Sequence, residues 1–232
     1  MKLALIGDIH GNDRALAAVL EAASAAHVDR LLVTGDLVGY YFAPGQVLDL
    51  LGEWDRDVVR GNHEEMLAAA RSNAAYLAKV GARYGSGVRI ALEQLDAKQL
   101  DGLCSLPHPL ELELDGVRIL LCHGAPWDLD QYIYPDAEHS LIARCASANY
   151  DLVVTGHTHY PMQKEIGRGI LVNPGSVGQT RDRQPGACWA LFDTVSRVIE
   201  LRRESYDSTG LMNECRQRHP ELPYLSEVLE RR

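Results

Sequence analysis

Short runs of valine, leucine and isoleucine alternate with longer amphipathic stretches through much of the chain. Apolar runs of this length are typical of strands that are buried within a sheet. We predict such strands at residues 3–6, 31–34, 58–60, 118–122, 152–155 and 170–172, with further candidates at 112–114, 188–192 and 198–202.

The stretches between the early strands have the periodicity of helices. Across residues 12–26 the apolar side chains recur every three or four positions, which places them on one helix face, and Asn12 or Asp13 can cap the first turn. Pro44 suits the first turn of a second helix that extends to residue 51. Residues 64–80 and 136–148 are also expected to be helical, and the C-terminal tail to form one or two packing helices.

The order of these elements predicts a fold class. Strands and helices take turns at first and several strands then follow in succession, which favours an α/β sandwich with a mixed central sheet region. The 232 residues contain no linker, repeat or low-complexity stretch. We therefore expect a single domain over 1–232, in which residues 170–232 supply strands and packing helices.

Composition narrows the class of partner. Lys and Arg number 23 against 32 Asp and Glu, and the net charge of −9 disfavours binding to nucleic acid or to an anionic membrane. No apolar stretch approaches the roughly 18 residues of a membrane span, and the first residues lack the pattern of a signal peptide. The five cysteines form no C-x-x-C pair, so we expect reduced core thiols in a cytoplasmic protein. The oligomeric state stays open.

Polar side chains follow five of the predicted strands, at the point where each strand ends. In α/β sheets ligands bind beyond this edge, and imidazole, carboxylate and amide oxygens together suit Zn, Mn, Fe or Co. A metal site is therefore predicted there. The set comprises Asp8, His10, Asp36, Asn62, His63, His123, His157 and His159.

Two of these histidines stand in the motif TGHTH, separated by one small residue. Two histidines one helical turn apart can grip a single ion, but this spacing differs. We expect the side chains of His157 and His159 to point to opposite sides of an extended segment and so to reach two ions that lie side by side. Two such ions need a bridging ligand, which a carboxylate such as Asp36 can supply.

The ordered motifs D-x-H, G-D, G-N-H-E, H-G and G-H-T-H resemble those of the calcineurin-like metallophosphoesterases. With DIHGN, GDLVGY and the segment NPGSVGQTRD, they look most like the small single-domain bacterial phosphoesterases and phosphodiesterases of that superfamily. The resemblance implies a four-layer αββα sandwich of two mixed β-sheets flanked by helices. It also implies two divalent metal ions, the first held by Asp8, His10, Asp36 and His159 and the second by Asp36, Asn62, His123 and His157.

The same resemblance implies a mechanism of phosphoester hydrolysis. Two divalent ions, two aspartates and a bridging hydroxide leave a net charge of about +1, which attracts a phosphate anion even in an acidic protein. Asn62 matters because a carboxylate at its position would cancel that charge. The metal-bound hydroxide attacks phosphorus in line, and protonated His63 donates a proton to the leaving oxygen. The expected substrate is a small phosphodiester or phosphomonoester.

One motif departs from the pattern of many protein phosphatases of the superfamily. Those enzymes have G-D-x-x-D-R, in which the second Asp supports the catalytic His, whereas this chain has GDLVGY. A protein-phosphatase activity is therefore disfavoured. Glu64 or Glu65 is a candidate for orienting His63 instead, although a solvated helix start is the favoured interpretation of both.

Residues that contact the substrate are harder to predict. The stretch 126–134 follows His123 and contains three aromatic residues. Trp127 therefore either lines the substrate site or packs this loop against the rest of the protein. Arg181 either meets a phosphate oxygen or forms a surface ion pair. Ser176 lies in N-P-G-S-V-G rather than G-x-S-x-G, which favours a turn over a nucleophile.

Two other function classes stay open. The first is a non-catalytic, metal-binding scaffold of the same fold, which the intact ligand set disfavours. The second is a nuclease, which the net charge and the lack of a Lys/Arg-rich arm disfavour. The absence of G-x-x-x-x-G-K-[ST] excludes a P-loop enzyme.

Overall fold

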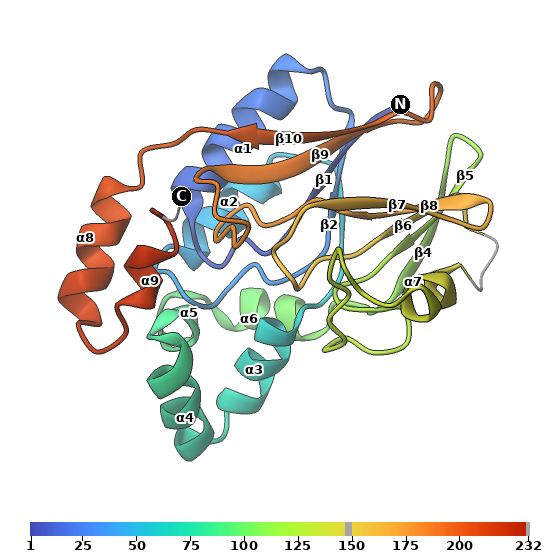
Figure 1. The fold of residues 1–232 in the computed structure, drawn as a ribbon. Coiled ribbons are helices and arrows are strands. Elements are labelled where there is room, and N and C mark those ends of the chain that lie inside the picture. Colours follow the sequence, from blue (N-terminus) through green and yellow to red (C-terminus); the bar gives the residue numbers. More distant parts are fainter. Residues whose placement is uncertain (147–149, 231–232) are drawn as a thin grey trace.

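A computed structural model describes residues 1–146 and 150–230. Two five-stranded mixed sheets lie face to face between helices, as the resemblance implied (Figure 1). The first sheet has the order β10(Ile199–Glu204)–β9(Ala187–Asp193)–β1(Lys2–Ile6)–β2(Arg30–Val33)–β3(Arg56–Val58). The second has the order β4(Leu110–Leu114)–β5(Val117–Leu121)–β6(Leu152–Val154)–β8(Gly169–Asn173)–β7(Met162–Ile166).

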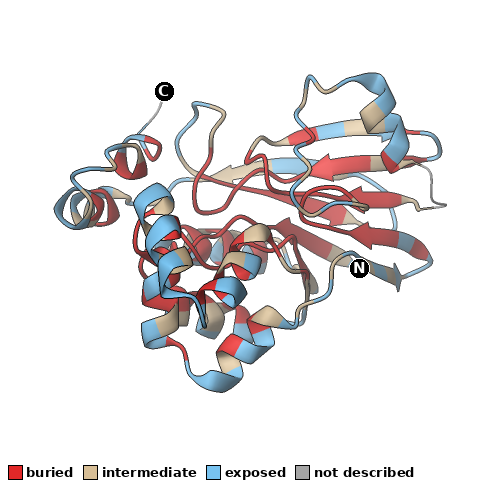
Figure 2. Cartoon of the chain, turned by 90° about the horizontal axis from the view of Figure 1, so that it is seen from below, coloured by how far each residue is buried: buried red, intermediate tan, exposed pale blue. Residues whose placement is uncertain are grey.

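Alternation along the central strands builds the two halves of the core. In β1, Leu3 and Leu5 join the apolar cluster between the sheets, whereas Ala4 and Ile6 face the helical side. The second sheet contributes Ile119 and Val154 to the inter-sheet cluster. Figure 2 shows buried residues concentrated in the interior strands, while the helices carry both buried and exposed positions. The edge strands β4 and β10 consist of intermediate and exposed positions. The sandwich therefore rests on the period-2 pattern of its strands.

Helices cover the outer faces unequally. On the first sheet α1(Asp13–Ala25) packs against β9 and β10, α2(Pro44–Gly52) packs beside α1, and a group of helices follows β3. Among the described residues, α7(His139–Cys145) is the helix that packs on the second sheet. The helices that follow β3 are α3(Asn62–Ala70), α4(Ala74–Tyr84), α5(Gly87–Gln94) and α6(Ala97–Cys104), and the C-terminal helices are α8(Thr209–Arg218) and α9(Tyr224–Glu227).

Most predicted elements are confirmed, with four differences. The strand predicted at 58–60 lies two residues earlier, at Arg56–Val58. The helix predicted over 64–80 is two helices, because Asn73 leaves the helix and caps α4 by accepting a hydrogen bond from Tyr76 N. The helix predicted over 136–148 begins at His139, and its residues 147 and 148 lie outside the described residues. Strand β7 and helices α5 and α6 were not predicted, because β7 has apolar residues only at its two ends and each of the two helices is only eight residues long.

The caps and thiols agree with the sequence in most details. Asn12 caps α1 by accepting a hydrogen bond from Ala15 N, and Pro44 occupies the first turn of α2. All five cysteines are free; four are buried, and Cys104 is half-buried at the end of α6. No helix in the described ranges is both long and apolar enough to cross a membrane.

Candidate metal centre

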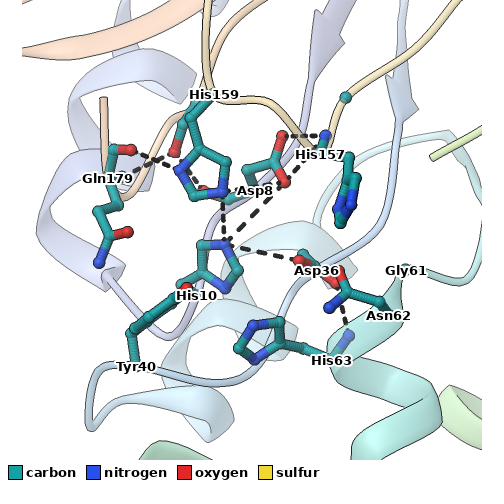
Figure 3. A network of polar contacts seen from close by, with 12 residues as sticks. Asp8, His10, Asp36, Tyr40, Gly61, Asn62, His63, His157, His159 and Gln179 are labelled. Atoms are coloured by element: carbon teal, nitrogen blue, oxygen red, sulfur yellow. Dashed lines mark hydrogen bonds and ion pairs between the residues drawn. The ribbon is translucent and has the colours of Figure 1, made fainter. Parts of the chain in front are cut away.

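The carboxyl ends of the parallel strands of both sheets meet at one edge, where all eight predicted polar residues gather. The two parallel sets are β1–β2–β3 and β5–β6–β8. The loop after each strand brings its polar side chains to the same place, as Figure 3 shows for seven of the eight. The sequence prediction of one shared site at this edge therefore agrees with the geometry.

The first group of side chains comprises Asp8, His10 and His159. The Nε2 atoms of His10 and His159 lie 3.2 Å apart. Asp8 Oδ1 is 3.5 Å from Nε2 of His159 and 4.0 Å from Nε2 of His10. Three ligand atoms therefore converge on one point, as the assignment to the first ion requires.

The second group comprises Asp36, His123 and His157, and Asn62 lies beside it. His123 Nε2 is 3.1 Å from His157 Nδ1 and 3.0 Å from Asn62 Oδ1. Asp36 Oδ2 is 3.5 Å from Nε2 of His123 and 3.6 Å from Nε2 of His10. This oxygen lies between the two groups, in the position of a bridging ligand.

The tautomers of three histidines can be derived from their outer hydrogen bonds. Nδ1 of His10, His123 and His159 contacts the backbone carbonyl oxygens of Val38 at 3.1 Å, Thr34 at 2.7 Å and Gln179 at 2.6 Å, respectively. A carbonyl only accepts, so each Nδ1 carries the proton and each Nε2 directs a lone pair into the site. The 3.2 Å contact between two such Nε2 atoms is repulsive unless a cation lies near both.

Burial dominates the electrostatics of the metal-free residues. It raises the pKa of Asp8 to about 8 and the pKa of Asp36 well above its ordinary value. It also lowers the pKa of His10, His123 and His159 well below the usual range of histidine. Histidines that stay neutral are ready ligands, and divalent cations would restore the charge of both carboxylates. The residues present therefore fit a pair of divalent ions.

The backbone at the site is held in the left-handed region. Of the ten non-glycine residues with positive φ in the described part of the chain, six lie here: Asp8, His10, Asp36, Tyr40, His157 and His159. Each such residue costs about 1–3 kcal/mol and persists only where the surroundings enforce it. The extended segment expected from the sequence cannot explain the separation of His157 and His159, because residues two apart on a regular strand point to the same side. Their φ values of 67° and 62° send them to the two different groups, as we expected from the motif.

Glu64 differs from the expectation of a solvated helix start. Its carboxylate is fully buried and accepts hydrogen bonds from the N–H groups of Asp36, Leu37 and Gly61, each at 2.8 Å, and of Val38 at 3.3 Å. It therefore fixes the Asp36 loop against the start of α3. Of these two glutamates, Glu65 is the one exposed to solvent, and its Oε1 lies 3.4 Å from Nη2 of Arg60.

We expect Glu64→Gln to destabilise the protein by about 2–4 kcal/mol, because an amide nitrogen would face buried N–H donors in place of a carboxylate oxygen. Denaturant unfolding of the metal-depleted protein measures this loss without a contribution from metal binding. The matched variant Glu65→Gln changes an exposed ion pair and should alter stability by no more than about 0.5 kcal/mol. Equal stabilities of the two variants would contradict the role given to Glu64.

His63 lies over the site without joining either group of three described above, although with His10 and Asp36 it forms a third set of converging ligand atoms. Its ring centroid is 4.7 Å from that of His10, 4.9 Å from that of Tyr40 and 5.2 Å from that of Tyr84. The ring packs so closely over Gly39 that a Cβ there would lie 1.9 Å from Nδ1. Aromatic neighbours, rather than a carboxylate, therefore orient His63.

The free site keeps His63 neutral. Burial, followed by the nearby charge of Arg181, lowers the pKa of His63 to about 3. The protonated imidazole expected from the sequence does not describe this state. An anionic substrate beside the ring would favour the protonated form, so proton donation is a property of the occupied site.

Arg181 is a mostly buried cation whose hydrogen-bond partners are neutral. Its Nη2 lies 3.0 Å from both Tyr40 Oη and Gln179 Oε1. Burial opposes its charge, but Tyr40 and the carboxylate of Asp8 raise the pKa of Arg181 overall. The same charge lowers the pKa of His63 and His159. Arg181 is therefore a fixed positive charge at the site rather than a member of a surface ion pair.

Trp127 and Ser176, the remaining residues considered from the sequence, make contacts that stabilise the fold. Trp127 packs against the apolar cluster on the outer face of the second sheet, and the guanidinium of Arg144 lies 3.8 Å from its ring centroid. These contacts favour the packing alternative. Ser176 Oγ donates to Asp8 O at 2.7 Å and accepts from Gln179 N at 2.7 Å, which is the turn role we expected.

Comparison with known families decides the relationship. The profile of the calcineurin-like phosphoesterase superfamily domain matches residues 1–197. The chain belongs to this superfamily. The resemblance drawn from five short motifs is thereby confirmed, together with the fold that it implied.

Individual members of the superfamily resemble the chain over nearly its whole length. An uncharacterised protein of Methanocaldococcus jannaschii is 30% identical in an alignment of length 223 that covers 88% of this chain and 88% of its own. Phosphodiesterase YfcE of Escherichia coli is 26% identical over 88% of this chain and 95% of its own. The crystal structure of a metallophosphoesterase from Sphaerobacter thermophilus has 27% identity and a TM-score of 0.79, and covers 99% of this chain and 98% of its own.

Proposed function

We propose that this protein is a phosphoesterase that uses two divalent metal ions to hydrolyse small phosphoesters, with a phosphodiester as the favoured substrate. The supporting observation is the set of imidazole nitrogens and carboxylate oxygens that converge in two groups, with Asp36 Oδ2 between them. The similarity to a phosphodiesterase of Escherichia coli supports the diester.

In this proposal Asp8, His10, Asp36 and His159 hold one ion, and Asp36, Asn62, His123 and His157 hold the other. Manganese, iron, zinc and cobalt all suit this mixture of nitrogen and oxygen ligands. When bound, such ions would supply a hydroxide nucleophile near neutral pH and stabilise charge on phosphoryl oxygens. Asn62 contributes an oxygen without a negative charge.

The chain's own side chains then divide the remaining work. Arg181 adds a fixed positive charge beside the ligands, which favours an anionic substrate. His63 lies over His10 and Asp36 and holds a proton for the leaving oxygen once the anion has raised its pKa. Tyr40 holds the side chains of both residues in position, because its ring packs against His63 and its hydroxyl accepts a hydrogen bond from Arg181.

A metal reconstitution experiment tests the function. Chelator-treated protein should hydrolyse bis(p-nitrophenyl) phosphate at background rate, and addition of Mn²⁺, Zn²⁺, Co²⁺ or Fe²⁺ should restore activity by at least about 10³-fold with two ions bound per chain. p-Nitrophenyl phosphate, assayed in parallel, compares the monoester with the diester. Asp8→Asn, purified identically, reports any contaminating phosphatase.

Three outcomes would contradict the proposal in different ways. Full metal content with no hydrolysis of any ester would indicate a metal-binding scaffold. Hydrolysis that is independent of added metal would exclude the dinuclear mechanism. Preference for oligonucleotides over small esters would favour a nuclease.

A further inference from the structure

Two exposed tyrosines lie beside the proposed metal centre with their rings almost parallel. Tyr132 and Tyr134 are 43% and 39% exposed, and their ring planes differ by only 10°. They belong to the segment between β5 and α7, and follow His123 in the chain. Large aromatic surface is usually withdrawn from water, so a parallel exposed pair at a catalytic edge is a candidate ligand surface.

Contacts with neighbouring side chains hold the two tyrosines in place. Ile133, between the two tyrosines, is buried in the apolar cluster on the outer face of the second sheet. The ring of Tyr132 contacts the ring of His157, with centroids 4.0 Å apart. The ring of Tyr134 packs edge-on against Tyr160 at 5.8 Å. Both tyrosines therefore rest on the segment that carries the metal-ligand histidines, and they require little ordering when a ligand binds.

The two tyrosines lie close to the groups that we propose to bind the phosphate. His157, under Tyr132, belongs to the second group of ligand atoms. The charge of Arg181 acts on Tyr132 as well as on His63 and Asp8. A phosphoester whose phosphate is held by the metal centre would therefore have one of its ester groups next to the two tyrosines. Tyr132 is in direct ring contact with His157, a proposed metal ligand.

We infer that the Tyr132–Tyr134 pair, hereafter the tyrosine platform, binds a planar aromatic group carried by the substrate, and that the substrate is a small nucleotide-type phosphoester whose base stacks there. This inference rests on the proposed function for the phosphate end of the ligand. The ring centroids of Tyr132 and Tyr134 are 5.6 Å apart, which leaves no room for a third ring between them. The base therefore stacks on the side of the pair that faces away from His157. A platform of two rings suits one base, and the net charge of −9 disfavours a long nucleic acid.

Binding measurements with two ligands that share a phosphate test the platform. Isothermal titration calorimetry compares adenosine 5′-monophosphate with ribose 5-phosphate, with and without Mn²⁺, so that turnover is not needed. Stacking of one base on an aromatic residue contributes about 1–3 kcal/mol, or a factor of about 5 to 150 in Kd. Wild-type protein should prefer the nucleotide by a factor within that range.

The variants separate the platform from general effects. Tyr132→Ala and Tyr134→Ala should each bring the ratio of the two Kd values toward one, while Tyr132→Phe keeps it. Tyr150→Ala, at the opposite end of the second sheet beside the start of β6, should leave the ratio unchanged. A wild-type ratio near one would overturn the inference, and so would an equal loss of affinity for both ligands in the two alanine variants.

The two proposals fail in distinguishable ways. Nucleotide-selective binding by a protein that hydrolyses no ester would remove the proposed reaction and leave the platform as a binding site. Hydrolysis of simple diesters without any preference for a base would remove the platform alone.

Discussion

Asp36→Asn is expected to lose both metal ions and to lower hydrolysis by at least about 10³-fold. The reason lies in the two oxygens of this carboxylate. Asp36 Oδ1 accepts a hydrogen bond from His63 N at 2.8 Å, so the amide oxygen of asparagine would occupy that position. The amide NH₂ would then replace Oδ2 between His10 and His123, where it cannot act as a ligand.

Elemental analysis of the purified variants measures this loss directly. His159→Ala removes a ligand of the first group only, so it should retain the second ion. Asp101→Asn, which changes an exposed aspartate paired with Arg71, should retain both. Equal metal loss in Asp36→Asn and His159→Ala, or a full complement in Asp36→Asn, would argue against the bridging position.

His63→Ala is expected to keep both metal ions and to lose about 10²–10⁴-fold in kcat on alkyl or nucleoside phosphodiesters. His63 contributes through a proton rather than through ligation, so the loss should depend on the leaving group. A nitrophenolate leaves readily as an anion, and the defect on nitrophenyl esters should therefore be much smaller. The comparison needs kcat for both ester classes and the metal content of each preparation.

A matched variant controls for the removal of an imidazole. His139→Ala changes an exposed histidine at the start of α7 and should behave as wild type on both esters. The third set of ligand atoms, His10, Asp36 and His63, offers the contrary outcome. A uniform loss of activity on every ester, together with missing metal, would place His63 among the ligands.

The sequence by itself determined the central features of this protein. Short continuous apolar runs predicted most of the strands, because a strand buried on both faces requires such a run, and the family resemblance implied their division into two sheets. The proposed ligand set could be listed because each polar residue closely follows a strand, and parallel strands bring their carboxyl ends to one edge. The family followed from the order of those motifs, and the domain profile confirms it.

The tertiary structure alone decided how the site is held together. Glu64 is a buried acceptor for two loops, although its neighbour in the same helical turn is solvated, and local sequence does not distinguish the two. Arg181 bonds to the hydroxyl of Tyr40, and Tyr132 contacts His157, and in both pairs the two residues are distant in sequence. Such contacts depend on which loops meet across two sheets. Local periodicity indicates which apolar residues are buried, whereas the burial of a polar residue and the partner that it meets are set by the packing of the whole chain.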